Sequence, residues 1–130
     1  MCGFTGFVSR SAPDVNALHA MGDTIRHRGP DDEGYFADDH CAIAHRRLSI
    51  IDLTEGGHQP MVSADGRYVL AYNGEIYNFQ TLRAELESLG RVFTTSSDTE
   101  VLLQGYIQWG AEVTKKLRGM FAFVIWDKQE

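Results

Sequence analysis

Short apolar segments of strand length are interspersed along this chain with segments whose apolar residues recur at helical spacing. The strand candidates cover residues 3–9, 34–37, 41–48, 67–72 and 121–126, and the helix candidates cover residues 13–27, 78–89 and 97–109. Such elements bury their apolar faces by packing against one another in layers. The order of the segments therefore predicts an α+β layered fold with a mainly antiparallel sheet.

Residues that start and stop helices mark the helical segments. Pro13 stands near the start of the first segment, Gly29 lies just beyond its end, and Gly90 stops the second segment. The third segment opens with Ser-Asp-Thr-Glu at 97–100, which is a capping-box pattern. Local chemistry and apolar periodicity therefore predict the same three helices.

Length, charge and cysteine content narrow the class of protein. The 130 residues suit one domain, and a net charge of −6 leaves no basic stripe to neutralise phosphates. No apolar segment is long enough to span a membrane, and no basic region followed by an apolar run marks a secretory signal. Two cysteines do not form a disulfide framework. These features argue against nucleic-acid and membrane partners, and the expected location is the cytoplasm.

The cysteine at position two has a chemical meaning if Met1 is removed. Removal leaves a thiol and a free α-amine on the same residue, so that Cys2 carries a nucleophile together with its base. This is the arrangement of N-terminal nucleophile enzymes. The alternative is a cysteine that stands at this position by chance.

Six short segments occur in a particular order along the chain. They are the opening Met-Cys-Gly, His-Arg-Gly-Pro-Asp at 27–31, Arg-Leu-Ser-Ile-Ile-Asp at 47–52, Asn-Gly-Glu-Ile-Tyr-Asn at 73–78, Ser-Asp-Thr-Glu at 97–100 and Gly-Met-Phe-Ala-Phe at 119–123. Together they resemble the glutaminase domain of glutamine-hydrolysing asparagine synthetases, which are class II glutamine amidotransferases. The resemblance implies a four-layer αββα sandwich of the N-terminal nucleophile hydrolase type. It also implies hydrolysis of L-glutamine to L-glutamate and ammonia through a γ-glutamyl thioester.

The resemblance assigns the reacting groups to two segments. Cys2 would be the nucleophile, and the Asn73 side chain with the Gly74 backbone N–H would form the oxyanion hole. Oxyanion-hole donors act by being fixed where negative charge develops. Without the resemblance, the Asn-Gly pair is interpreted as a tight turn after a strand.

The resemblance also assigns the groups that bind the substrate carboxylate. Arg47 would clamp the α-carboxylate of glutamine, and backbone groups around Leu48, Ile50 and Ile51 would line the same side of the site. A guanidinium matches a carboxylate bidentately. Arg46 is a rival by chemistry alone, but neighbouring residues in a strand point to opposite faces. Arg46 is therefore expected to be a solvated surface charge.

Acidic residues would receive the other end of the substrate. The resemblance assigns Asp98 and Glu75 to the α-ammonium group of glutamine. The acidic residues and the arginine would then bind the opposite charges of the zwitterionic substrate. The alternative for Asp98 is a favourable interaction with the N-terminus of its own helix.

The remaining reactive residues receive no role in the reaction. The five histidines and two cysteines do not form a recognised metal-ligand spacing. His27 is expected to shape a loop near the site, and Cys41 is expected to be an inert buried thiol. Trp109 and Trp126 are expected to be packing residues.

The resemblance further predicts what surrounds this chain. Residues 1–130 would be part of a glutaminase domain, truncated after an apolar strand, and the isolated piece would have little activity. A frayed polar terminus is the alternative interpretation of the last residues. The partners would be L-glutamine and an absent ATP-dependent synthetase domain, and a homodimer is left open. That domain would use ATP and Mg, whereas this chain lacks its Ser-Gly-Gly-x-Asp-Ser loop and needs no cofactor.

Two other functions stay open. The same glutaminase chemistry could serve an acceptor other than aspartate, as in asparagine-synthetase-like amidotransferases. The fold could also be a non-catalytic module that binds glutamine or a partner, although relatives that abandoned the reaction lose the N-terminal cysteine and Cys2 is present here.

Overall fold

The computed structural model describes residues 2–48 and 55–129, which form two three-stranded antiparallel sheets. The first sheet has the order β1-β3-β2, and the second has the order β4-β5-β6. The strands are β1 (Gly3–Val8), β2 (Asp32–Ala37), β3 (Cys41–Arg47), β4 (Met61–Val62), β5 (Tyr68–Ile76) and β6 (Gly119–Asp127).

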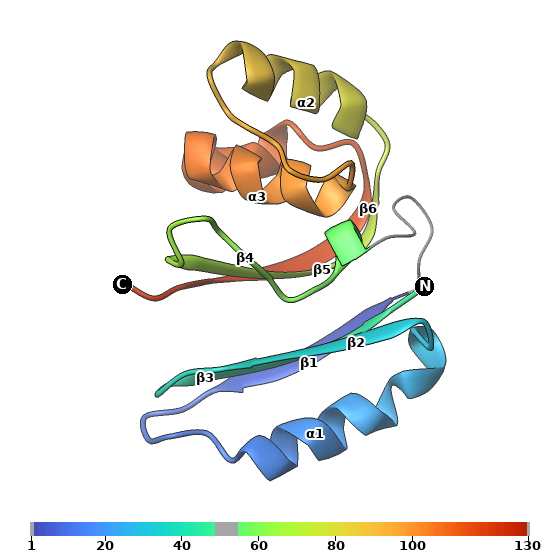
Figure 1. Cartoon of the computed structure of the whole chain (residues 1–130), viewed down its shortest axis with the longest axis vertical. Helices are drawn as coiled ribbons and strands as arrows, with labels where there is room; N and C mark the ends of the chain where they lie inside the picture. Colours follow the sequence, from blue (N-terminus) through green and yellow to red (C-terminus); the bar gives the residue numbers. More distant parts are fainter. Residues whose placement is uncertain (1, 49–54, 130) are drawn as a thin grey trace.

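Three α-helices cover the outer faces of the two sheets. They are α1 (Val15–Thr24), α2 (Phe79–Ser88) and α3 (Asp98–Trp109), and 3₁₀ helices occupy Arg26–Arg28, Glu55–Gly57 and Gly110–Lys115. Helix α1 lies along the first sheet, whereas α2 and α3 stack on the far side of the second sheet (Figure 1). The layers therefore follow the order α, β, β, α, which confirms the predicted four-layer sandwich. None of the helices in the described part of the chain is long and apolar enough to cross a membrane.

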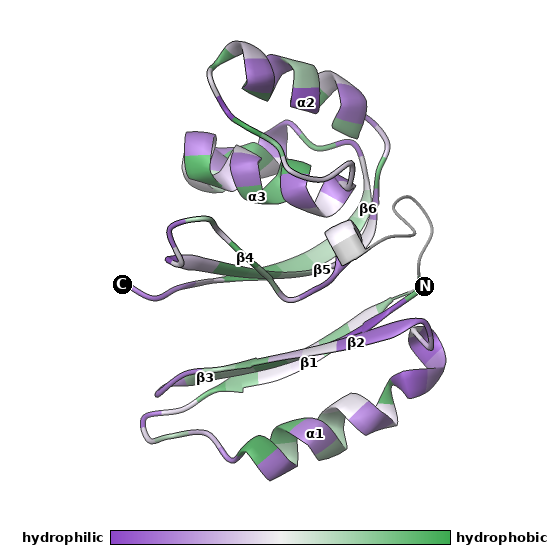
Figure 2. Ribbon diagram, in the orientation of Figure 1, coloured by the Kyte–Doolittle hydropathy of each residue, from purple (hydrophilic) through white to green (hydrophobic). Residues whose placement is uncertain are grey.

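Strand β3 is the centre of the first sheet and is buried on both faces. Cys41 and Ile43 pack toward Val69 and Ala71 of the second sheet. The intervening residues Ala42 and Ala44 pack against Leu18 of α1. In Figure 2 apolar residues run along the strands of both sheets, whereas polar residues are frequent along the helices. The alternation of side chains along β3 therefore sorts its residues between two separate cores.

A third and larger core lies between the second sheet and its helices. Leu70, Tyr72 and Ile76 of β5 pack there with apolar residues of α2 and α3. Leu82 and Leu86 supply the buried face of α2. This packing fixes the start of α3 against the middle of β5.

The helix starts follow the predicted chemistry with shifted boundaries. The Asp14 side chain accepts hydrogen bonds from the N–H groups of Asn16 and Ala17, so α1 begins at Val15 instead of at the preceding proline. The Ser97 side chain caps α3 by accepting from the N–H of Glu100. The predicted helices are confirmed, and local capping sets their first residues.

Strand β5 is longer than the sequence pattern predicts. It continues past Tyr72 to Ile76, and Asn73 and Gly74 pair with Ala122 and Phe121 of β6. The interpretation of the Asn-Gly pair as a tight turn is therefore wrong. A long apolar partner strand keeps this polar segment extended.

Candidate active site

A cavity of about 360 Å³ opens where both sheets meet the start of α3. The segment before β1, the end of β3, the second half of β5 and the first half of β6 contribute to its walls. The lining residues are Cys2, Arg47, Leu48, Gly57, Gln59, Tyr72, Asn73, Gly74, Glu75, Ser97, Asp98, Thr99, Met120, Phe121 and Ala122. The structure thus gathers residues from nearly the whole length of the chain into one pocket.

The sequence-predicted site residues in the described part of the chain all line this cavity. They are Cys2, Arg47, Leu48, Asn73, Gly74, Glu75 and Asp98. Ile50 and Ile51 lie outside the described residues. The geometry therefore brings together groups that are up to ninety-six positions apart in sequence (98 − 2).

The thiol of Cys2 is held by the backbone just after β3. The N–H of Leu48 donates to Sγ of Cys2 at 3.3 Å, and the thiol lies 3.5 Å from the Leu48 carbonyl oxygen. The Nε–H of Arg28 donates to the Cys2 carbonyl oxygen at 3.1 Å. The exposed His27 precedes Arg28 in the same 3₁₀ helix, so the loop predicted to lie near the site contacts the nucleophile through its arginine.

Gly74 is required by its backbone and by its neighbours. Its φ of +148° lies in the region that favours glycine. A Cβ atom there would collide with the backbone of Met120 and Phe121 in β6. The close pairing of β5 with β6 at the cavity wall therefore requires a residue without a side chain at this position.

Arg47 and Arg46 leave β3 on opposite sides, as the strand pattern predicts. Arg47 is buried and lines the cavity, where Gly57 leaves room for its guanidinium. The cavity therefore has one cationic group on the β3 side.

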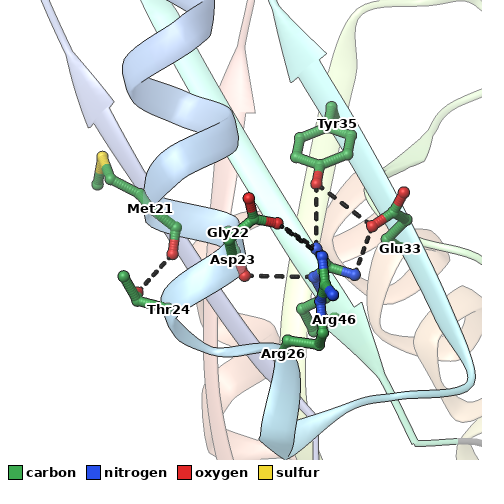
Figure 3. A network of polar contacts seen from close by, with 8 residues as sticks. All are labelled: Met21, Gly22, Asp23, Thr24, Arg26, Glu33, Tyr35 and Arg46. Carbon is green, nitrogen blue, oxygen red and sulfur yellow. Dashed lines mark hydrogen bonds and ion pairs between the residues drawn. The ribbon is translucent and has the colours of Figure 1, made fainter.

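The expectation that Arg46 is a solvated surface charge is wrong. Only 6% of Arg46 is exposed. Its guanidinium donates to the Gly22 carbonyl at 3.2 Å, pairs with Asp23 of α1 at 2.9 Å, and also pairs with Glu33 of β2 (Figure 3). The side chain lies under α1, and these acidic residues compensate for the loss of water around it.

Asp98 is the buried acid of the site. Its side chain, at the first residue of α3, accepts a hydrogen bond from the Tyr72 hydroxyl at 2.7 Å. Burial raises the pKa of Asp98, and hydrogen bonds from the Tyr72 hydroxyl and from backbone groups oppose that rise. Glu75 is exposed at the cavity rim. One buried and one exposed acid therefore share the cavity with Arg47.

The cavity is also lined by Gln59, Tyr72 and residues of β6, to which the sequence motifs assigned no role. The Gln59 side chain accepts from the Tyr72 N–H at 2.6 Å and donates to Thr99 Oγ1 at 3.4 Å. The available sequence signal for Tyr72 was its position directly before Asn73. No local pattern marks Gln59, because its role depends on a strand that lies thirteen residues further along the chain.

The other reactive side chains lie away from the cavity. Cys41 is buried, as expected, and burial with the nearby Asp38 raises its pKa to about 11, which favours the unreactive thiol form. Trp109 packs against the helical core, and Trp126 packs between the sheets. Within residues 2–48 and 55–129, no three His, Cys, Asp or Glu side chains are grouped so as to hold a metal ion.

Comparison with known proteins finds relatives over the whole chain. The family model described as glutamine amidotransferase domain matches residues 1–130. Asparagine synthetase [glutamine-hydrolyzing] 1 of Bacillus subtilis is 48% identical over 100% of this chain and 21% of its own length. Asparagine synthetase B [glutamine-hydrolyzing] of Escherichia coli is 47% identical over 82% of this chain and 19% of its own length. The chain thus spans about a fifth of these relatives.

A solved structure shares the fold. The glutamine phosphoribosylpyrophosphate amidotransferase from B. subtilis, complexed with ADP and GMP, superposes with a TM-score of 0.81. The match covers 98% of this chain and 35% of the solved one at 23% identity. The two-sheet sandwich around the cavity is therefore an architecture that also occurs in a protein of distant sequence.

Proposed function

Because this chain belongs to the glutamine amidotransferase domain family, we propose that its cavity binds L-glutamine and that Cys2 hydrolyses the side-chain amide. The products are L-glutamate and ammonia. The observation that carries this proposal is the single cavity that holds a thiol, an Asn-Gly pair and charges of both signs. These are the groups that amide hydrolysis of a zwitterionic substrate requires.

The charges in the cavity support a particular orientation of glutamine. Arg47 binds the α-carboxylate, and the backbone at Leu48 lies beside it next to Cys2. Asp98 and Glu75 receive the α-ammonium. With both ends of the amino acid held, the side-chain amide extends toward the thiol.

The reaction proceeds in two stages at Cys2. The α-amine of the processed chain accepts the thiol proton, the sulfur attacks the amide carbon, and a C–S bond forms. Asn73 and the Gly74 N–H stabilise the oxyanion, a contribution typically worth roughly 10²–10³ in rate for each donor. The C–N bond then breaks, and ammonia leaves with the proton from the amine. Water attacks the thioester, the C–S bond breaks, and the thiol recovers its proton as glutamate departs.

The relatives' names suggest where the ammonia goes. Those relatives are called glutamine-hydrolysing asparagine synthetases, so we assign the ammonia to ATP-dependent asparagine synthesis in the cytoplasm. Residues 1–130 then form part of a glutaminase domain, and the synthetase domain with its ATP and Mg lies outside this chain. A glutaminase that supplied ammonia to a different acceptor would need the same cavity residues.

Labelling of Cys2 in the complete protein tests the proposed function. An electrophilic glutamine analogue should modify Cys2 and spare Cys41, because the buried Cys41 thiol holds its proton. Glutamine should protect Cys2 from the label. Mass spectrometry identifies the modified cysteine and the N-terminal residue in one sample, and ammonia release is measured in parallel.

A variant that retains Met1 provides the matched control. Its Cys2 nitrogen is an amide, which has no basicity near neutral pH, so the thiol loses its base. We expect this form to release no ammonia. Ammonia release at the rate of the processed protein would refute the N-terminal mechanism, and absence of Cys2 labelling in the processed protein would refute the glutaminase proposal.

A further inference from the structure

Tyr72 has all of its polar groups engaged at the wall of the cavity. Its N–H donates to Gln59 Oε1 at 2.6 Å, and its hydroxyl donates to Asp98 Oδ2 at 2.7 Å. Its carbonyl oxygen lies 2.9 Å from Nε2 of His45. Only 3% of Tyr72 is exposed. One residue therefore joins β3, β5, the segment before β4 and the start of α3.

The hydrogen on His45 can be placed from this contact. A carbonyl oxygen only accepts, so Nε2 of His45 carries the hydrogen and donates it to Tyr72. Burial lowers the pKa of His45 to about 4, which keeps the ring neutral at ordinary pH. The backbone of Tyr72 is thus held from the first sheet by a group that stays in a single protonation state.

The Gln59 side chain ties the same backbone to α3. It accepts from Tyr72 N–H through Oε1 and donates through Nε2 to Thr99, the residue after Asp98. Strand β4 begins two positions after Gln59, and its pairing with β5 ends at Leu70. The Gln59 amide therefore accepts the hydrogen bond of the Tyr72 N–H just beyond the end of that pairing. The contact fixes the spacing between β5 and the N-terminus of α3.

The hydroxyl of Tyr72 acts as a donor to a desolvated carboxylate. Burial and the neighbouring Asp98 charge raise the pKa of Tyr72, so the phenol keeps its hydrogen. Burial also raises the pKa of Asp98, and the hydrogen bond from Tyr72 opposes that rise. The bond also fixes one oxygen of the carboxylate in place, and Asn73 follows Tyr72 directly in β5.

We propose that Tyr72 is a positioning residue that selects for substrates with an α-ammonium group, because its hydroxyl holds the Asp98 carboxylate in the orientation that receives this group. The inference rests on the proposed glutaminase function. Tyr72 itself acts through Asp98, and its backbone places Asn73 on the same wall. Removal of the hydroxyl should therefore weaken recognition of the ammonium and leave the chemistry at Cys2 intact.

The test compares two substrates in the complete protein with Tyr72→Phe. One is L-glutamine, and the other is glutaramate, which has the same amide but no α-amino group. A hydrogen bond to a charged group is worth enough to predict a roughly tenfold rise in KM for glutamine, with kcat changed less than about threefold. We expect kcat/KM for glutaramate to stay unchanged. Tyr106→Phe is the matched control, because it removes a hydroxyl from α3 away from the cavity.

The pH profile gives a reading that a purely structural role would not change. Without the Tyr72 donor the pKa of Asp98 rises further, so the acidic limb of kcat/KM for glutamine should move to higher pH. Glutaramate should show no such movement. Arg47, Glu75 and Cys2 also line the cavity, and Tyr72→Phe leaves all three in place, so their contributions are common to both proteins.

A double-mutant cycle with Asp98→Asn checks that the effect passes through Asp98. If it does, Tyr72→Phe adds little to the glutamine KM once Asp98 is replaced. Multiplicative effects of the two substitutions would overturn the proposal, as would an equal loss of kcat/KM for both substrates. Melting temperatures of all variants identify loss of fold. A processed protein that releases no ammonia would instead refute the glutaminase function, and with it this inference.

Discussion

Arg46 and Arg47 are sequence neighbours whose side chains enter different parts of the molecule. The pleat of β3 directs Arg47 into the cavity and Arg46 under α1. Both are buried, yet Arg46 has acidic partners from α1 and β2, whereas Arg47 faces the position proposed for a carboxylate. An arginine in this strand can therefore stabilise the fold or bind a ligand, depending on the face of the strand from which its side chain projects.

Replacing each arginine by alanine should separate these two roles. Arg47→Ala should weaken glutamine binding by roughly 2–5 kcal/mol, because a buried carboxylate would lose its charged partner. Arg46→Ala should lower the free energy of unfolding by about 2 kcal/mol and leave the glutamine KM nearly unchanged, since its partners are half exposed. Urea unfolding and glutamine titration of both variants measure the two quantities. Equal glutamine affinities for the two variants would contradict the assignment of Arg47.

His45 makes stability depend on pH. Within the described residues its Nδ1 is buried and has no hydrogen-bond partner, and burial lowers the pKa of His45 from 6.5 to about 4. The unfolded chain therefore binds a proton at a higher pH than the folded chain does. The stability is fully present above about pH 6.5 and is lost as the pH falls toward 4, by a total of about 3 kcal/mol.

Urea unfolding between pH 7 and 4 tests this dependence. His45→Gln removes the titrating ring and should flatten the profile over this range. His27→Gln replaces an exposed histidine and should keep the wild-type slope. A wild-type slope in His45→Gln would show that other groups cause the dependence.

At the scale of elements, the start of α3 is organised by a carboxylate that binds the preceding segment. Glu100 accepts hydrogen bonds from the N–H groups of Thr94 and Thr95 and from both of their hydroxyls. In a capping box this side chain would bond the N–H of the capping Ser97. Here only the Ser97 half of that pattern is present, and Glu100 reaches further back. The segment that leads to Asp98 is thus tied to α3 itself.

Glu100→Ala should release this segment. We expect a loss of about 2–4 kcal/mol in the free energy of unfolding, because four partly buried N–H and O–H donors of Thr94 and Thr95 lose their charged acceptor. Glu112→Ala is the control, since Glu112 makes an exposed pair with Lys115 and should change stability by less than about 0.5 kcal/mol. Chemical denaturation measures both. Similar losses in the two variants would show that Glu100 does not anchor the segment.

Strand and helix periodicity predicted a layered α+β fold but not the ends of every strand and helix, and the family resemblance predicted the four layers. The pattern ended β5 at Tyr72, because polar residues follow, whereas pairing with β6 extends the strand to Ile76. Arg46 was expected in solvent because it lies on the strand face away from the cavity, whereas the acidic residues that compensate it come from α1 and β2. The family motifs located most of the cavity wall. Gln59 and Tyr72 required the three-dimensional contacts between distant segments.

For the whole molecule, the two sheets are joined at both ends of their interface. The cavity occupies one end, near the last residues of β3. At the other end Trp126 of β6 donates through Nε1 to Asp38 at 2.6 Å. The same carboxylate accepts from the N–H groups of His40 and Cys41 in the turn between β2 and β3. Asp38 therefore fastens the sheets at the end away from the proposed reaction.

Asp38→Ala should destabilise the sandwich without changing substrate recognition. Loss of a carboxylate that accepts three hydrogen bonds should cost about 2–3 kcal/mol of unfolding free energy. The glutamine KM should stay within about twofold where the variant is folded, because the cavity lies at the opposite end. Asp39→Ala removes a neighbouring exposed acid and should have little effect on stability. A rise in KM for Asp38→Ala at full folding would show that the two ends are coupled.

The residues of the cavity wall are far apart in the sequence, so the ribosome synthesises them at different times. Cys2 is made at the start, whereas Met120, Phe121 and Ala122, which complete the wall, come more than a hundred residues later. Synthesis at ~5–20 residues per second separates these events by on the order of 10 s. During that interval a trimming peptidase can reach the bond between Met1 and Cys2 before β6 closes the pocket. A chain trimmed in this interval would expose its nucleophile while the cavity is still unfinished, and the last strand would then enclose a processed chain end.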